Sequence, residues 1–418
     1  MSPAPREAER PLTIALASIE YPPDRFSAGI GSYAKALARL LHERGHRVHV
    51  VTRGTDREEL TEEEGVFVHR LLPGRPELPE NLSPGPIVRL LARSLPAELA
   101  YRRKVVTTLT RLVRQEGVDL VEAADHMAET LGYDPTRFPK VPFVVRLHTP
   151  LAVTERLAPN IPETARLGIR LLERRLLRKA THLTSPSASA TAVIMAEMGL
   201  DLPVATYPNP PSYAAQARDP GVQEEPGMVL FVGRLNTLKG VDLLARAIPR
   251  VLEVRPDARF VFAGADNIPY GGFPSVSRYL LSLLPSRAHH AIAFTGHLLH
   301  DELRDLYPRA TLCVFPSRFE SFGYTCLEAM GFGKAIVGSN SGGMAEMLDG
   351  GAGLLFTPPD VDELTEKILR LLNDPELRRD LGARARRRAA EAYGQEAVMD
   401  QVEEFYRRAI AERSLGPA

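Results

Sequence analysis

The chain has 418 residues, more than one ordinary domain holds, so its length predicts two domains. Hydrophobic residues make up 44% and charged residues 25% of the sequence, as in globular proteins. Lysine plus arginine and aspartate plus glutamate are balanced at 52 each, so the overall charge does not point to a nucleic-acid partner. No apolar stretch is long enough to span a membrane, and the polar residues 1–11 lack the core of a signal peptide.

The first half of the chain alternates short apolar runs with amphipathic helical patterns. We expect a helix at 30–43, ending near Gly45, and strands at 12–17, 46–51, 119–122 and 143–148. Strands that alternate with helices in this way predict a parallel, doubly wound sheet.

A proline-rich polar stretch at 207–227 interrupts the alternation, which then restarts. We expect a helix from Val241 and strands at 228–232, 259–263, 293–295, 311–315 and 335–337. The sequence therefore predicts two α/β domains, at residues 1–210 and 227–397, joined by a linker at 211–226.

The two cysteines have no metal-ligand spacing. Cys313 lies in a predicted strand and Cys326 in the first turn of a predicted helix. We expect both to be buried free thiols of a cytoplasmic protein, because the cytoplasm keeps thiols reduced.

The most informative segment, at 315–330, carries Glu320 and Glu328 with seven residues between them. It follows a predicted buried strand, so Glu320 falls in the strand-to-helix loop and Glu328 inside the helix. The N–H groups of Phe322, Gly323 and Tyr324 then lie at the helix N-terminus, which favours anions. Such a pocket suits a nucleotide sugar, because N–H groups can hold its phosphates and carboxylates can accept bonds from its hydroxyls.

The segment resembles the Glu-x7-Glu motif of the retaining family-four glycosyltransferases, which have the GT-B fold. Further matches occur in the same order along the chain, at 27–33 (a glycine loop), 231–240 (Gly-Arg-Leu…Lys-Gly) and 338–346 (Gly-Gly-x-x-Glu). The similarity covers nearly the whole chain and is far more specific in the C-terminal half. It implies two Rossmann-like domains facing a central cleft, with the last helix, at 398–418, packing back onto the first domain.

Gly233, Arg234 and Lys239 follow the first strand of the predicted second domain. A guanidinium and an ammonium group suit a diphosphate and the charge that develops on it as a leaving group. A surface ion pair for Arg234 and simple solvation for Lys239 would explain the two cations if they stood alone, but the Glu-x7-Glu segment favours phosphate binding. In the family, the glutamate matching Glu328 holds the ribose hydroxyls and the one matching Glu320 meets the donor sugar.

In the N-terminal half, Gly29 and Gly31 resemble the glycine loop that approaches the distal phosphate. An ordinary strand-to-helix turn explains this Gly-x-Gly equally well. His148 ends a predicted strand, where doubly wound sheets face the cleft, and it resembles the family's cleft histidine. We expect it to donate a hydrogen bond or stabilise charge near the reacting carbon, rather than to act as a general base.

Glu122 and Asp125 follow a neighbouring predicted strand. Contact with the acceptor is one interpretation of these carboxylates, and loop solvation or helix capping is at least as good. Asp360 and Asp362 have the Asp-x-Asp spacing of metal-dependent transferases, but they open a predicted helix, and capping explains them better. We therefore expect no metal and no cofactor besides the donor substrate.

Two arginine-rich segments remain. Residues 89–114 carry seven lysines and arginines, which could rest on an anionic membrane or a phosphorylated lipid acceptor. An arginine-rich outer helical face is the favoured explanation. At 166–179 the stripe of Leu167, Leu171, Leu172 and Leu176 predicts ordinary core contact.

The resemblance implies transfer of a sugar from a UDP- or GDP-sugar to an acceptor hydroxyl, with retention and without metal. A non-transferring GT-B enzyme, such as a nucleotide-sugar epimerase, would leave the glutamate pair unexplained. A glycoside hydrolase would leave Arg234 and Lys239 without a role. An inactive sugar-nucleotide-binding protein is disfavoured, because every motif position carries a competent residue.

Overall fold

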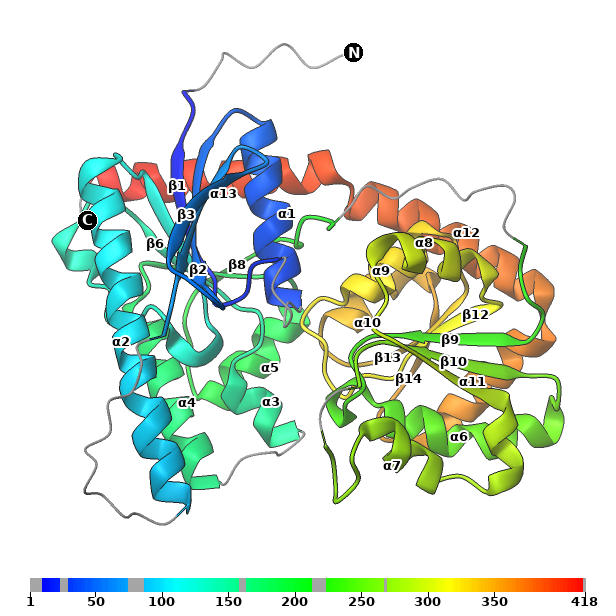
Figure 1. Cartoon of the computed structure of the whole chain (residues 1–418). Helices are drawn as coiled ribbons and strands as arrows, with labels where there is room; N and C mark the ends of the chain where they lie inside the picture. The colour runs from blue at the N-terminus through cyan, green and yellow to red at the C-terminus, as the bar shows by residue number, and fades with distance from the viewer. Residues whose placement is uncertain are drawn as a thin grey trace, which may run out of the picture.

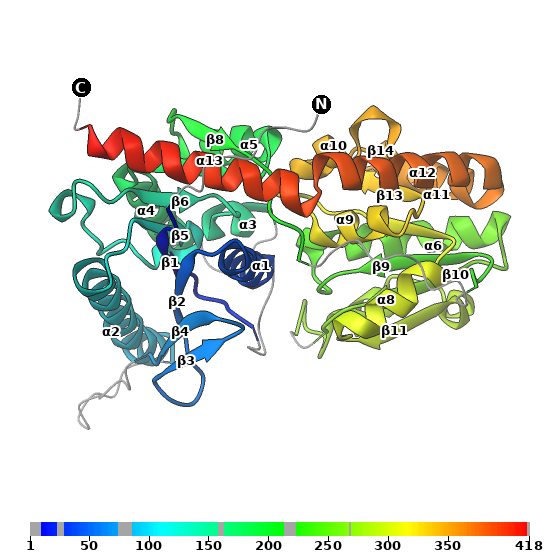
Figure 2. The same cartoon turned by 90° about the horizontal axis from the view of Figure 1, so that it is seen from above.

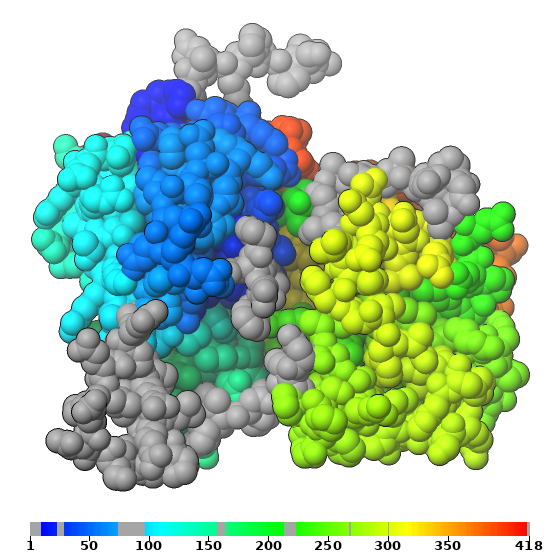
Figure 3. Space-filling view, in the orientation of Figure 1, coloured from blue at the N-terminus to red at the C-terminus, as the bar shows by residue number. Residues whose placement is uncertain are grey.

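The computed structural model describes residues 10–22, 29–73, 86–157, 163–212, 223–266 and 269–415. Two α/β lobes lie side by side, each built on its own sheet (Figure 1). The surface between the two lobes is hollowed (Figure 3). This is the predicted GT-B architecture, so the expected fold class is confirmed. Part of the predicted linker, at 213–222, lies outside the described residues.

The sheet of the N-terminal lobe has the strand order β3-β4-β2-β1-β5-β6-β7-β8 within the described residues. Its strands are β1 (Thr13–Ala17), β2 (Arg47–Arg53), β3 (Glu59–Glu63), β4 (Val66–Leu71), β5 (Leu120–Ala124), β6 (Phe143–Arg146), β7 (His182–Ser185) and β8 (Val204–Thr206). Neighbouring strands pair in parallel except at the β3 edge. There Glu64 and Gly65, both with positive φ, form a two-residue turn that makes β3 antiparallel to β4, a departure from the wholly parallel sheet that we expected.

Both faces of this sheet are covered. Its helices are α1 (Gly29–Glu43), α2 (Pro86–Gln115), α3 (Leu151–Leu157), α4 (Glu163–Lys179) and α5 (Ala188–Met198). Because side chains alternate along a strand, Ile14 of β1 packs in one core with α1, whereas Ala15 packs in another with α2, α4 and α5.

The sheet of the C-terminal lobe has the order β11-β10-β9-β12-β13-β14, and its pairs are all parallel. Its strands are β9 (Met228–Val232), β10 (Arg259–Ala263), β11 (Ile292–Gly296), β12 (Leu312–Phe315), β13 (Ile336–Ser339) and β14 (Leu354–Phe356). The helices are α6 (Val241–Val254), α7 (Val276–Ser282), α8 (His300–Arg309), α9 (Tyr324–Gly331), α10 (Gly343–Met347), α11 (Val361–Asn373) and α12 (Pro375–Ala392).

The last helix, α13 (Gln395–Ser414), leaves the C-terminal lobe and runs across the N-terminal one (Figure 2). Arg44 at the end of α1 pairs with Glu396 and Asp400 of α13. The Tyr406 hydroxyl donates to Glu122 of β5 at 2.8 Å. Helix α13 is thus tied into the first lobe.

The core contact predicted for the leucine stripe on α4 is confirmed for Leu176 and wrong for its other three members. Leu167, Leu171 and Leu172 are 55%, 59% and 40% exposed, and only Leu176 is buried. The inward positions of this helix are occupied instead by Leu176, Leu177 and a buried carboxylate, Glu173.

The basic segment at 89–114 lies on α2, and the side chains of 86–96 are outside the described part. Arg102 donates to the Met127 carbonyl at 2.7 Å, Lys104 pairs with Glu58, and Arg114 lies over the ring of Phe138. These partners favour the outer-face interpretation. Within the described ranges, no helix combines the length and apolar character of a membrane span.

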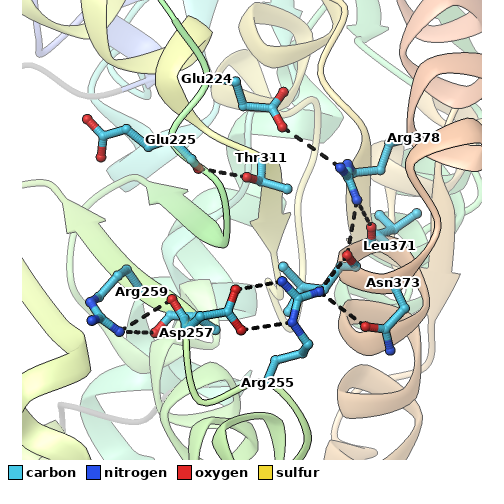
Figure 4. A network of polar contacts seen from close by, with 11 residues as sticks. Glu224, Glu225, Arg255, Asp257, Arg259, Thr311, Leu371, Asn373 and Arg378 are labelled. Atoms are coloured by element: carbon cyan, nitrogen blue, oxygen red, sulfur yellow. Dashed lines mark hydrogen bonds and ion pairs between the residues drawn. The ribbon is translucent and has the colours of Figure 1, made fainter.

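A polar network ties together the C-terminal lobe near the start of β9, β10 and β12 (Figure 4). Arg255 bonds Asp257 at 2.7 Å and the Leu372 carbonyl at 2.7 Å, which joins α6 to the end of α11. Thr311 donates to the Glu225 carbonyl at 2.8 Å. These groups satisfy one another's hydrogen-bonding capacity at the amino ends of the strands, so we assign this end of the lobe a role in stability.

Candidate functional site

The loop after β9 carries Arg234 and, in the short helical turn η3 (Thr237–Lys239), Lys239. Gly240 ends that turn with φ of 66°, and a Cβ there would lie 1.8 Å from the Pro316 carbonyl oxygen. Only glycine permits this approach. The Lys239 loop therefore lies directly against the loop that follows β12.

That contact brings Lys239 and Glu320 together, and their side chains form an ion pair. Arg318 reinforces it by bonding both oxygens of Asp242 at 2.7 Å. The Arg318 N–H also donates to the Leu238 carbonyl at 2.8 Å. The predicted phosphate-binding cation and the predicted sugar-binding carboxylate are thus neighbours.

At the start of α9, Gly323 is the N-cap residue with φ of 100°. The N–H groups of Phe322, Gly323 and Tyr324 form no hydrogen bond to another described residue. Glu328 lies one turn further along α9 and accepts a bond from the Tyr307 hydroxyl at 2.8 Å. The structure therefore places both glutamates and the helix N-terminus on one connection, as the sequence predicted.

Both lobes take part in this region. Leu238 and Phe319, the residues before Lys239 and Glu320, pack in the core cluster of the N-terminal lobe. Burial lowers the pKa of His126, which follows β5 in the other lobe, and the nearby charge of Arg234 acts in the same direction. The cations and carboxylates of the C-terminal lobe thus lie at the boundary with the N-terminal lobe.

His148 follows β6 in the N-terminal lobe and is buried. Its ring packs edge-on against Tyr33 at a centroid distance of 4.7 Å, and both residues line a small cavity. Burial, with the charge of Arg146 added, holds the pKa of His148 well below its usual range. The neutral imidazole is therefore favoured, with one ring N–H to donate and one ring nitrogen to accept.

Acceptor contact by Glu122 and Asp125 stays a prediction; both carboxylates are buried, and Glu122 lines the same small cavity as His148. Glu122 is buried, and its two oxygens accept bonds from Tyr33 at 2.6 Å and Tyr406 at 2.8 Å. Asp125 is fully buried and accepts a bond from the His148 N–H at 3.1 Å. Glu122 connects β5 to α1 and α13 in the core, so neither loop solvation nor helix capping describes it.

Gly29 and Gly31 lie at the start of α1, and the preceding residues 27–28 of the glycine loop are outside the described part. The Gly31 N–H donates to Glu20 at 3.4 Å. Sequence reasoning missed Glu20, which no motif distinguishes. Its carboxylate lies where we expected the distal phosphate, which agrees with the preference of a helix N-terminus for anions.

A second missed residue is Glu173 of α4. Its buried carboxylate accepts bonds from the N–H groups of Met127 (3.0 Å), Leu151 (2.7 Å) and Ala152 (3.1 Å). Burial raises its pKa to about 7. Glu173 thus holds the loops after β5 and β6, which carry His126 and His148, and nothing in its arginine- and leucine-rich surroundings distinguishes it in the sequence.

Asp360 caps α11 by accepting the Glu363 N–H at 2.8 Å, and Asp362 pairs with Arg250, so capping is confirmed for Asp360. The described residues contain no cluster of His, Cys, Asp and Glu able to hold a metal. Cys313 and Cys326 are buried free thiols, as predicted, and burial raises the pKa of Cys313 to about 12.

Comparison with known proteins gives matches over most of the chain. The family model "Glycosyl transferases group 1" matches residues 213–388, and "Glycosyl transferase 4-like domain" matches residues 28–210. A D-inositol 3-phosphate glycosyltransferase of Kineococcus radiotolerans is 28% identical, covering 96% of this chain and 95% of that protein.

Solved structures are similar in fold. Sucrose-phosphate synthase from Thermosynechococcus elongatus has a TM-score of 0.76 at 21% identity, covering 96% of this chain and all of that one. Anabaena HepE, in complex with UDP and glucose, has a TM-score of 0.66 at 18% identity, covering 94% of this chain and 99% of that one.

Proposed function

The chain belongs to the group 1 glycosyltransferases with the GT-B fold, and from that premise we propose that it transfers a sugar from a nucleoside diphosphate sugar to an acceptor hydroxyl with retention of configuration. The observation that carries the proposal is the Lys239–Glu320 pair beside the open N–H groups of α9. It joins a cation, a carboxylate and a helix N-terminus at the lobe boundary.

Arg234, Lys239 and the N–H groups of Phe322, Gly323 and Tyr324 bind the diphosphate in this proposal, with Gly233 allowing close approach. A diphosphate carries more charge than a carboxylate, so it displaces Glu320 as the partner of Lys239. Glu320 is then released to accept bonds from the sugar hydroxyls. Glu328 accepts bonds from the ribose, and Gly29 and Gly31 approach the distal phosphate.

The chemical step follows from these roles. The C1–O bond to the diphosphate breaks while the acceptor oxygen attacks from the same face, and the departing phosphate oxygen takes the acceptor proton. Arg234 and Lys239 stabilise the negative charge on the leaving group. Neutral His148 donates a hydrogen bond near the reacting carbon. These cations and N–H groups supply the charge stabilisation for which other transferases use a metal.

A UDP-sugar is the first donor to test, because the similar HepE structure contains UDP and glucose. A GDP-sugar is the second. The experiment incubates the protein with UDP-, GDP- and ADP-sugars and a panel of alcohols, sugars and sugar phosphates, and follows the products by mass spectrometry. Equal amounts of nucleoside diphosphate and new glycoside support transfer. An epimerised donor without glycoside indicates the epimerase, and no product with any pair indicates a binding protein.

A further inference from the structure

Helix α10 of the C-terminal lobe meets the start of α5 of the N-terminal lobe (Figures 1 and 2). The carboxylate of Glu346 on α10 accepts bonds from the N–H of Ala188, at 3.3 Å, and from that of Ser189. The first N–H groups of a helix have no partner within it and carry partial positive charge. Glu346 therefore supplies from one lobe the anion that a helix of the other lobe favours.

A second bond crosses the boundary at the same place. The Ser187 hydroxyl donates to the Ser321 carbonyl at 3.0 Å, while its oxygen accepts the Ala190 N–H at 3.1 Å. Ser321 follows Glu320 directly. The start of α5 is thus bonded both to α10 and to the loop that carries the sugar-binding carboxylate.

Within the C-terminal lobe, Gly342 and Gly343 connect α10 to that loop. The Gly343 N–H donates to the Glu320 carbonyl at 2.7 Å. A Cβ at Gly342 would lie 2.2 Å from the Glu320 carbonyl oxygen, and one at Gly343 would lie 2.3 Å from that of Ser321. The two backbones touch, so a displacement of α10 displaces Glu320.

Helix α10 is also fixed to its own lobe. Arg388 of α12 donates to the carbonyls of Glu346, at 2.7 Å, and Met347, at 3.0 Å. The glutamate side chain therefore reaches the N-terminal lobe from a helix that is held firmly in the C-terminal lobe.

We propose that Glu346 is a positioning residue, which stabilises the contact between the lobes and, through Gly342 and Gly343, sets the position of Glu320 for transfer. The contact exists only when the lobes are together, so it favours that arrangement over an opened one. This inference rests on the role proposed for Glu320. It adds the residue that couples the position of Glu320 to closure of the lobes.

The first test measures kcat at saturating donor and acceptor, and the Kd of the nucleoside diphosphate, for the wild type and variants at position 346. Glu346→Ala lowers kcat about 10-fold or more, the scale on which misplacing a catalytic group acts. The Kd of the nucleoside diphosphate changes less than threefold, because Arg234 and Lys239 remain. Glu346→Gln keeps one acceptor oxygen without the charge, so its kcat lies between those of the wild type and Glu346→Ala. The control Glu376→Ala, at an exposed glutamate on α12 of the same lobe, keeps the wild-type values.

The second test needs no turnover. Spin labels on Arg175→Cys and Glu366→Cys, exposed positions on α4 and α11, report the distance between the lobes, and the native cysteines are buried. Glu346→Ala broadens or lengthens this distance distribution, and Glu376→Ala does not.

A wild-type kcat and an unchanged distance in Glu346→Ala would overturn the inference, even if its melting temperature falls. If Glu346→Ala does not fold, the same two measurements on Glu346→Gln decide. A wild type that transfers no sugar contradicts the proposed function instead, and the distance measurement still decides whether Glu346 holds the lobes together.

Discussion

The roles of Arg234 and Lys239 can be tested one residue at a time. We expect Arg234→Ala and Lys239→Ala each to lower turnover by roughly two to three orders of magnitude, because each removes a preorganised charge from the leaving group. Steady-state kinetics with the best donor measures this. Lys367→Ala, at a lysine paired with Glu366 on α11, is the control and keeps wild-type turnover. Near-normal turnover in both site variants would remove the diphosphate-binding role.

The two glutamates differ in what they contact, so their variants separate in kinetics. Glu328→Ala raises the donor Kd with a small effect on kcat, because the ribose does not react. Glu320→Ala lowers kcat more than it weakens binding, because its contacts to the sugar strengthen in the transition state. Turnover at saturating donor, with donor binding measured by calorimetry, distinguishes them. The opposite pattern would exchange the two roles.

At the residue scale, the sequence predicted the C-terminal site better than the N-terminal one. Arg234, Lys239, Glu320 and Glu328 lie in short segments whose spacing already indicates a strand-to-helix connection. The burial of Glu122 could not be predicted, because its partners, Tyr33 and Tyr406, are distant in the chain.

Between β2 and β4, His49 and His69 form a buried pair whose ring nitrogens are 3.2 Å apart. Burial is the main cause that lowers the pKa of each to about 4, from an ordinary value of 6.5. At pH 7 both histidines are mostly neutral in the folded and in the unfolded protein. Below pH 6.5 the unfolded chain binds them and the folded protein does not, so the pair destabilises the fold as the pH falls toward 4.

We therefore expect the wild type to lose on the order of 2–4 kcal/mol more of its unfolding free energy between pH 7 and pH 5 than a His49→Leu/His69→Leu variant does. The comparison between variants is needed because Glu129 and Glu173, whose pKa values are raised to about 7, act with the opposite sign. Urea unfolding of both proteins at pH 7 and at pH 5 measures this difference in unfolding free energy. Equal losses in both proteins would show that the pair takes up protons in the folded state.

At the element scale, buried strands were predictable and half-exposed elements were not. β9 and β10 have the predicted bounds, because apolar runs between turn residues define them. β3 was not predicted because it is the polar strand Glu59–Glu63 at the sheet edge. The α4 leucines were assigned to the core because periodicity shows which residues share a face, not whether another element covers it.

For the whole molecule, the return of α13 to the first lobe predicts a stability effect. Tyr406→Phe removes a hydrogen bond to buried Glu122 and lowers the unfolding free energy by about 1–3 kcal/mol. Tyr133→Phe is the matched control, because the Tyr133 hydroxyl is buried without a hydrogen-bond partner among the described residues. We expect it to be neutral or stabilising. Urea midpoints that fall equally in the two variants would mean that the Glu122 bond adds nothing.

We also expect turnover to be unchanged by EDTA, because Arg234, Lys239 and the α9 N–H groups supply the charge stabilisation in the proposed mechanism. The rate is measured before and after chelation and after adding Mg²⁺ or Mn²⁺. Loss of activity in EDTA that either ion restores would show that a metal shares this role.

The most direct measurement of the central claim is the NMR spectrum of the product formed from a nucleoside diphosphate sugar and an accepted alcohol. The account predicts a new glycoside whose anomeric coupling and shift show the donor's configuration, with one equivalent of nucleoside diphosphate released and both lost in the Lys239→Ala variant. A glycoside of inverted configuration, or release of nucleoside diphosphate without any glycoside, would contradict it.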